Sequence, residues 1–177
     1  MTPAGPPNGR LAVFPGSFDP LTNGHVDIIL RSTHLFERVL VAVLVNAEKQ
    51  PLFTADERVA MVREVFREYS NVDVDSFDGL LVEYARARRA SAIIRGLRAV
   101  SDFEYEFQMA LMNRHLEPAL ETVFMMPAQQ YTYLTSRRAK AAPQSPGPAI
   151  PISTPPAACS TSQARDAPVT TTLRSMN

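Results

Sequence analysis

The amino-acid sequence predicts an α/β protein built on a doubly wound, five-stranded parallel sheet, followed by a disordered C-terminal tail. Three observations lead to this prediction. Short apolar runs alternate with helix-like segments between residues 10 and 126, and a turn rich in glycine and proline follows the first of these runs. Beyond residue 136 the composition changes to one that is typical of disordered chains.

Five apolar, β-branched runs are expected to form the strands, and they cover residues 11–14, 39–45, 72–74, 92–95 and 122–126. One helix is expected to start near residues 23–25. A second follows a capping box at Thr54–Glu57 and runs to about Tyr69, and a third spans 103–116 before Pro118. This alternation favours a parallel sheet that is covered on both faces and binds ligands beyond the carboxyl ends of its strands.

The C-terminal segment differs from the rest of the chain. No aromatic residue follows Tyr133, and 7 of the 15 prolines lie from Pro143 onward. Residues beyond 136 hold 5 of the 18 basic residues but only 1 of the 18 acidic ones. Such a segment buries too little apolar surface to offset the entropy cost of ordering it. We therefore expect a flexible N-terminus over 1–9, a folded domain over 10–136 and a low-complexity tail over 137–177.

Composition argues against several classes of function. The chain carries 18 basic and 18 acidic residues, so its charge predicts neither a nucleic-acid partner nor an anionic membrane. Its single cysteine, Cys159, can form no internal disulfide and no cysteine-based metal cluster. No stretch approaches the ~18 apolar residues of a membrane span, and residues 1–9 lack the pattern of a signal peptide. We expect a soluble, cytoplasmic protein without a resident metal.

Polar and glycine residues gather where the predicted strands end. They lie in the loops at 16–19, 46–49, 79–81, 95–98 and 127–136. Because the carboxyl ends of parallel strands meet at one edge of a sheet, these loops predict a pocket for a substrate with anionic groups. The sequence contains neither a P-loop nor a G-x-G-x-x-G dinucleotide motif, so another phosphate-binding arrangement is needed. A helix that starts at residues 23–25 would supply one through its N-terminal N–H groups.

These residues also resemble a known family. Gly16-Ser17-Phe18-Asp19-Pro20 followed by Thr22-Asn23-Gly24-His25 is similar to the signature of nucleotidyltransferases of the HxGH superfamily. The stretches at 94–100, 102–106 and 112–114 resemble the phosphopantetheine adenylyltransferase family of bacterial coenzyme A synthesis. The resemblance covers roughly residues 10 to 136 and implies a Rossmann-like nucleotidyltransferase fold.

The resemblance implies transfer of adenylyl from ATP to the 4′-phosphate of phosphopantetheine, with Mg²⁺, giving dephospho-coenzyme A and pyrophosphate. A phosphate monoester is already anionic at neutral pH, so the reaction needs no general base and depends on positioning and charge stabilisation. His25 is the implied catalytic residue, as a donor to the α-phosphoryl oxygens. The family is commonly hexameric, so the resemblance also implies a homo-oligomer.

The same resemblance assigns the binding residues. For phosphopantetheine they are Ser17, Lys49, Leu81 and Arg95. For ATP they are Ser17, Phe18, His25, Gly96, Leu97, Arg98, Glu106, Tyr131, Thr132, Tyr133, Leu134, Thr135, Ser136 and Arg137.

Simpler structural roles remain open for several of these positions. A lone histidine can cap a helix, while Lys49, Arg95 and Glu106 can be solvated surface charges. The aromatic residues Phe103, Tyr105 and Phe107 can pack in the core or in an interface.

The chain departs from its relatives at Arg137. The superfamily expects a second signature, roughly I-S-S-[ST]-x-x-[KR], whereas this chain reads Leu134-Thr135-Ser136-Arg137-Arg138-Ala139-Lys140. Pro143, Pro146 and Pro148 then exclude the long helix that should follow. A frameshift near codon 137 or a mis-annotated gene would produce this sequence, and a natural low-complexity tail is the third alternative. Two functions stay open: a working adenylyltransferase, or an impaired relative that binds phosphopantetheine or coenzyme A but handles ATP poorly.

Overall fold

The computed structural model describes residues 10–45, 51–98 and 100–131. Its elements in chain order are β1 (Leu11–Gly16), α1 (Asn23–Ser32), β2 (Arg38–Leu44), α2 (Ala55–Phe66), β3 (Val72–Phe77), α3 (Leu81–Ala87), β4 (Ala92–Gly96), α4 (Val100–Leu116), β5 (Glu121–Met125) and a short 3₁₀ turn η1 (Gln129–Tyr131). The predicted flexible N-terminus and the predicted tail lie outside the described residues.

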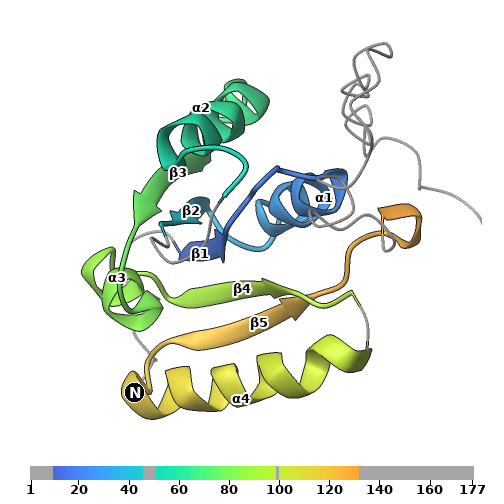
Figure 1. Cartoon of the computed structure of the whole chain (residues 1–177). Helices are drawn as coiled ribbons and strands as arrows, with labels where there is room; N and C mark the ends of the chain where they lie inside the picture. Colours follow the sequence, from blue (N-terminus) through green and yellow to red (C-terminus); the bar gives the residue numbers. More distant parts are fainter. Residues whose placement is uncertain (1–9, 46–50, 99, 132–177) are drawn as a thin grey trace, which may run out of the picture. The chain divides into compact units, whose positions relative to one another are not determined.

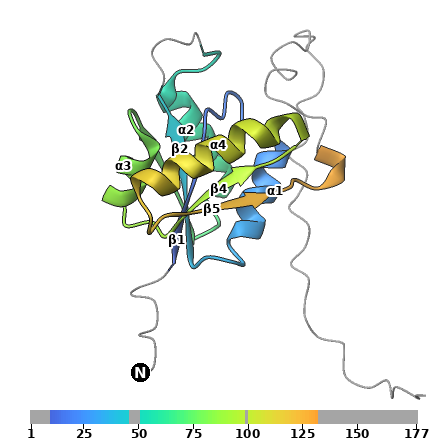
Figure 2. The same cartoon turned by 90° about the horizontal axis from the view of Figure 1, so that it is seen from below.

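The five strands form one parallel sheet in the order β3-β2-β1-β4-β5 (Figures 1 and 2). The predicted α/β fold with a doubly wound parallel sheet is confirmed. The chain winds outward from β1 to β2 and β3, returns through α3, and winds outward again from β4 to β5. The point where the winding direction changes lies between β1 and β4, and this is where doubly wound sheets bind ligands.

Three strands are longer than their apolar runs predicted. β1 continues through Pro15 to Gly16, and both residues still pair with β2. β3 continues through residues 75 and 76 to the buried Phe77, and β4 gains Gly96. Proline, glycine and polar residues interrupt the apolar runs, whereas backbone pairing continues through them.

The helices form a layer on each face of the sheet. One core joins α1 and α2 to the sheet through fully buried residues such as Ile29, Val41 and Val62. The other core packs α3 beneath the sheet around Leu40, Val82 and Ile93. α4 lies against β5 on the lower side in Figure 1. This double cover explains why the central strands read as continuous apolar runs.

Helix starts follow local hydrogen bonding. The predicted capping box is present at α2, where the Thr54 backbone N–H donates to Glu57 Oε2 at 2.8 Å and the Glu57 N–H donates to Thr54 Oγ1 at 3.3 Å. α2 ends at Phe66, three residues before the predicted end, since the Tyr69 N–H bonds to the Phe66 carbonyl in a turn. α4 begins at Val100, three residues before its predicted start.

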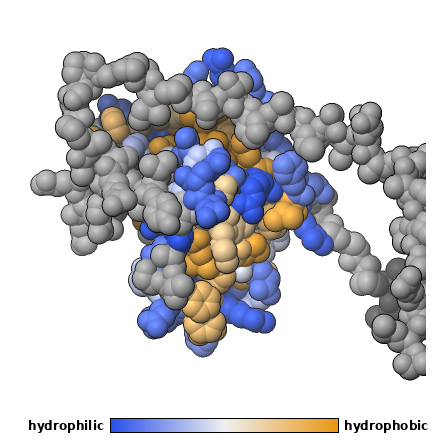
Figure 3. Space-filling view, turned by 90° about the vertical axis from the view of Figure 1, so that its right-hand side faces the viewer, coloured by the Kyte–Doolittle hydropathy of each residue, from blue (hydrophilic) through white to orange (hydrophobic). Residues whose placement is uncertain are grey.

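α4 is unusual because apolar side chains surround it. Its large apolar residues with more than a third of their surface exposed are Phe103, Tyr105, Phe107, Met109, Leu111, Met112 and Leu116. Figure 3 shows apolar side chains gathered in the lower part of the molecule, where α4 lies. Packing in the core, one of the two alternatives for the three aromatic residues, is therefore wrong for this chain. Within the described ranges, no helix is long and apolar enough to span a bilayer.

Candidate active site

A pocket of about 560 Å³ opens at the carboxyl ends of β1 and β4, where the winding of the sheet changes direction. Its walls come from the β1–α1 turn, the start of α1, the end of β4, one side of α4 and η1. The lining residues are Phe14, Pro15, Gly16, Ser17, Phe18, Thr22, Gly24, His25, Ile28, Arg95, Gly96, Arg98, Asp102, Glu106, Pro127 and Tyr131. The pocket lies at the sheet edge that the sequence predicted.

The β1–α1 turn places an aromatic ring beneath the pocket. Phe18 adopts a φ of +44°, a conformation that bulky L residues avoid, and only 1% of its surface is exposed. Its ring meets His25 edge-on at 5.3 Å between centroids. A Cβ atom on Gly16 would lie 2.9 Å from the same ring, so residue 16 must be glycine for Phe18 to pack there.

Hydrogen bonds to Thr22 determine which nitrogen of His25 carries the proton. The backbone N–H of Thr22 donates to His25 Nδ1 at 3.1 Å, and the Thr22 hydroxyl lies 3.0 Å from the same nitrogen. Because a backbone N–H can only donate, Nδ1 must accept, and the neutral ring carries its proton on Nε2. His25 therefore presents an N–H donor beyond its helix N-terminus rather than a lone pair.

Burial keeps this ring neutral. Desolvation, as the larger cause, and the positive charge of Arg98 together lower the pKa of His25 from 6.5 to about 4. At neutral pH the imidazole is thus an uncharged donor. Positive charge in the pocket comes instead from Arg95, Arg98 and the N-terminus of α1.

Both arginines already have acidic partners. Arg95 forms a two-pronged ion pair with Glu106, with Nε–Oε2 at 2.7 Å and Nη2–Oε1 at 2.6 Å. Arg98 Nε lies 3.4 Å from Asp102 Oδ2. An anionic ligand must share these cations with the carboxylates or displace them, and the carboxylates keep the arginines oriented toward the pocket until it does.

The structure brings together most of the predicted site residues that it describes. Those that line the pocket are Ser17, Phe18, His25, Arg95, Gly96, Arg98, Glu106 and Tyr131. Leu97 follows β4 beside the pocket and bonds through its N–H to the Met125 carbonyl. Leu81 does not line the pocket, because it begins α3 and packs against the core on that side. Lys49 and residues 132–137 lie outside the described residues.

Sequence reasoning assigned no site role to several lining residues. For Thr22 the sequence does contain a signal: it lies three residues before His25, which is the spacing of a helix cap. Asp102 could have been found by its position four residues after Arg98, close to the start of the predicted helix. Pro127 lies in the loop at 127–136 that was expected at the pocket, whereas Ile28 looks like an ordinary core residue and carries no signal.

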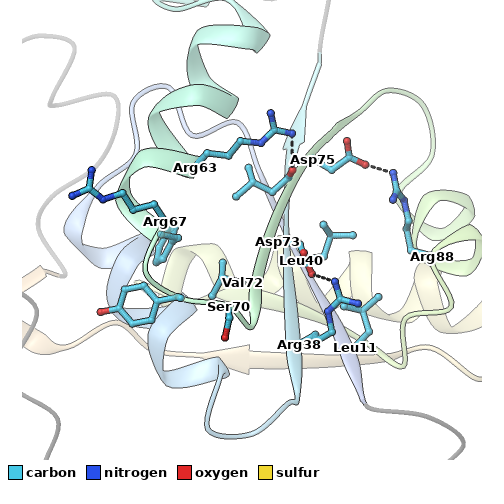
Figure 4. A pocket seen from close by; sticks show the side chains of 13 residues that line it. Leu11, Arg38, Leu40, Arg63, Arg67, Ser70, Val72, Asp73, Asp75 and Arg88 are labelled. Carbon is cyan, nitrogen blue, oxygen red and sulfur yellow. Dashed lines mark hydrogen bonds and ion pairs between the residues drawn. The ribbon is translucent and has the colours of Figure 1, made fainter.

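A second hollow, about 720 Å³, lies around the free edge of β3 and is larger than the pocket (Figure 4). Arginines from β2, from α2 and from the end of α3 line it, and they contact β3. Arg38 pairs with Asp73 at 2.5 Å, Arg88 pairs with Asp75, and Arg63 donates to the Val74 carbonyl at 3.1 Å. These charged contacts cover the edge strand, which is a common way to protect the edge of a sheet.

Among the residues that the structure describes, no group of three or more histidine, cysteine, aspartate or glutamate side chains could hold a metal ion. The two acidic side chains of the pocket, Asp102 and Glu106, face arginines. A metal at this site would therefore depend on ligand oxygens for most of its coordination.

The His25 environment predicts a pH-dependent stability. Because its folded-state pKa of about 4 lies below the unfolded value of 6.5, the unfolded chain binds more protons as pH falls. This contribution is absent above pH 6.5 and costs about 2 kcal/mol at pH 5. Urea unfolding at pH 7.5 and 5 should therefore show a smaller loss of stability in His25→Gln than in wild type. The control His34→Gln removes an exposed histidine, and its free energy of unfolding should fall as much as that of wild type. Equal falls in all three chains would contradict a neutral His25 ring.

Comparisons with known proteins agree with this architecture. The model of the cytidylyltransferase-like family matches residues 13–142. The nicotinic acid mononucleotide adenylyltransferase of Plasmodium falciparum, solved with NaAD, superposes with a TM-score of 0.55 at 13% identity, covering 75% of this chain and 82% of that one. The NadR protein, solved with NAD and AMP-PNP, gives a TM-score of 0.56 at 17% identity over 77% of this chain and 43% of that one. At these identities the likeness supports the fold alone.

Sequence relatives are much closer. A phosphopantetheine adenylyltransferase of Alkaliphilus metalliredigens is 56% identical over 131 residues, which are 74% of this chain and 83% of that protein. One of Caldanaerobacter subterraneus is 57% identical over 131 residues, 74% of this chain and 82% of that protein. With this identity, coverage and pocket, the chain belongs to the phosphopantetheine adenylyltransferase family of nucleotidyltransferases.

Proposed function

We propose that this chain transfers the adenylyl group of ATP to the 4′-phosphate of phosphopantetheine, giving dephospho-coenzyme A and pyrophosphate. The observation that carries this proposal is the neutral His25 ring, whose proton lies on Nε2 in a pocket that also holds two arginines. The reaction belongs to coenzyme A synthesis, and we place it in the cytoplasm.

The chemistry needs one bond to form and one to break. A phosphate oxygen of phosphopantetheine attacks the α-phosphorus of ATP, and the bond from that phosphorus to the oxygen bridging to the β-phosphate breaks. Pyrophosphate leaves with the bonding electrons. The nucleophile is already deprotonated at neutral pH, so no residue has to remove a proton. The pocket must align the two phosphates and stabilise the negative charge of the transition state.

The residues of the pocket divide this task. His25 donates from Nε2 to an α-phosphoryl oxygen, and the N–H groups at the start of α1 assist it. Arg95 binds the phosphate of phosphopantetheine and Arg98 binds the triphosphate, each exchanging its carboxylate partner for ligand oxygens. Ser17 contacts both substrates, while Phe18, Gly96, Leu97, Glu106 and Tyr131 contact ATP.

Mg²⁺ enters this scheme with ATP. Mg²⁺ keeps several waters and commonly reaches proteins through substrate phosphates and one or two carboxylates, and Asp102 and Glu106 are the carboxylates of this pocket. When bound, the ion neutralises charge on the leaving pyrophosphate. The other possibility from the sequence, an impaired relative that handles ATP poorly, is favoured by no feature of the described residues.

His25→Ala should lower kcat about 10²- to 10³-fold, because it removes a donor that faces charge developed in the transition state. The KM for each substrate should change much less. Steady-state assays of pyrophosphate release measure both constants. The matched control is His34→Ala, which removes an exposed histidine near the end of the first helical segment and should leave kcat unchanged. An undiminished kcat in His25→Ala would refute the assignment.

Arg95→Ala should weaken phosphopantetheine binding more than ATP binding, and Arg98→Ala should do the opposite. Titration calorimetry with each ligand alone measures the two affinities. Since Arg95→Ala leaves the buried side of Glu106 without its partner, the double variant Arg95→Ala/Glu106→Gln is the control for unpaired charge. Equal losses for both ligands in both arginine variants would contradict the division of the pocket.

The chain is also proposed to form a homo-oligomer through α4. Phe103 and Phe107 stack at 5.7 Å on this helix while 47% of each side chain remains exposed. A helix with apolar residues all round is normally buried. Acidic Glu104 lies in the first half of the helix, and Arg114 and His115 lie in its last turn, so a second copy running in the opposite direction matches it in charge.

Phe107→Glu should therefore lower the oligomer size, because it places a charge in the apolar contact. Size-exclusion chromatography with light scattering, at micromolar protein, distinguishes six copies from fewer. Leu35→Glu alters an apolar residue of similar exposure, 59%, away from α4 and should leave the size unchanged. A monomeric wild-type chain would contradict the proposal.

A further inference from the structure

Two buried charged residues that do not line the pocket form hydrogen bonds around the β1–α1 turn. Arg58 of α2 and Asp19 of the β1–α1 turn are each 4% exposed. Burying a charge is costly unless its hydrogen bonds are satisfied. Both side chains direct these bonds to the backbone around the pocket.

Arg58 joins three segments of the chain. Its Nη1 donates to the Ser17 carbonyl at 2.7 Å and to the Leu44 carbonyl at 3.1 Å. Its Nε lies within hydrogen-bond distance of the carbonyls of Phe53 at 3.1 Å and Thr54 at 3.3 Å. One guanidinium therefore links the β1–α1 turn, the end of β2 and the start of α2.

Asp19 makes complementary contacts, because it accepts hydrogen bonds from backbone N–H groups where Arg58 donates to carbonyls. Its carboxylate accepts the N–H of Leu52 at 2.9 Å and the N–H of Phe53 at 3.0 Å. The peptide groups of residues 52–54 are thus held at their N–H side by Asp19 and at their carbonyl side by Arg58. Between Ser17, which Arg58 binds, and Asp19 lies only Phe18, the residue with a φ of +44°.

We propose that Asp19 and Arg58 are positioning residues, which together keep Phe18 in its strained conformation and thereby hold Ser17 and His25 in place for adenylyl transfer. Backbone strain persists only where surrounding contacts over-determine it, and these contacts fall on either side of the strained residue. The inference rests on the proposed function.

Asp19 and Arg58 are connected to His25 through only a few contacts. Phe18 packs its ring against the imidazole, and Thr22, three residues beyond Asp19, donates to Nδ1. If the turn relaxes, the ring of Phe18 moves and His25 becomes more exposed to water. Its pKa should then rise from about 4 toward 6.5, since desolvation is the main cause of the low value and the charge of Arg98 is the lesser one.

The first test measures this pKa by NMR titration of His25 and needs no substrate. In Arg58→Met, which removes the donors and keeps an unbranched apolar side chain, we expect a rise of at least one unit. The matched control is Val62→Ala, which creates a core cavity one turn further along α2 and removes no hydrogen bond to the turn. It should lower the melting temperature and leave the pKa of His25 where it is.

The second test measures kcat at a temperature where every variant is folded. Arg58→Met and Asp19→Asn should lower kcat 10- to 100-fold with smaller changes in KM, because substrate is held by residues that remain. Arg58→Lys should recover part of this loss, since one ammonium can reach some of the carbonyls. Val62→Ala should stay within two-fold of wild type. If Arg58→Met does not fold, Arg58→Lys and Asp19→Asn decide the question by the same two measurements.

Variants that lose stability like Val62→Ala but keep both the pKa of His25 and kcat would overturn the proposal. If the variants raise the pKa of His25 but the wild-type protein transfers no adenylyl group, the positioning role of Asp19 and Arg58 is supported and the proposed reaction is refuted.

Discussion

The turn between β1 and α1 is the constraint on which the pocket depends. In six residues the chain must leave a central strand, bury the ring of Phe18 and begin a helix whose first N–H groups face the ligand. The backbone does this with one residue at positive φ and with Thr22 donating to His25. The tautomer of His25 follows from the donor that this turn supplies, while its low pKa reflects burial first and the charge of Arg98 second. The protonation of His25 is therefore fixed before any ligand arrives.

The positive side chains of the pocket are already paired with carboxylates, so an anionic ligand would exchange with these partners. Each pocket arginine has a carboxylate partner four or eleven residues away, so the free pocket avoids the repulsion that bare cations would cause. A phosphate offers a guanidinium the same planar pairing as a carboxylate. Binding can then replace one ion pair by another at modest cost. A neutral histidine fits this plan, because a further positive charge beside Arg98 would be unfavourable.

α4 shows how one helix can serve two purposes. Its first turns bring Asp102 and Glu106 to the pocket, while its apolar residues face outward along the same length. The two faces share a rigid element, so a contact made on the outer face would also bear on the position of Glu106 and, through it, of Arg95. The homo-oligomer proposed through this face would therefore act on the pocket.

The sequence by itself determined the layout of the protein. Alternating apolar runs and capped helices predicted the parallel sheet, and the Gly16–His25 turn predicted where its pocket would lie, because both signals depend on local periodicity and local backbone chemistry. Tertiary structure alone decided which residues meet. Arg95 pairs with Glu106 from another element, and Arg58 of α2 binds the turn that contains Asp19. Leu81 faces the core, a side that periodicity does not specify. Periodicity reports burial within one element, whereas these contacts depend on how separate elements approach one another.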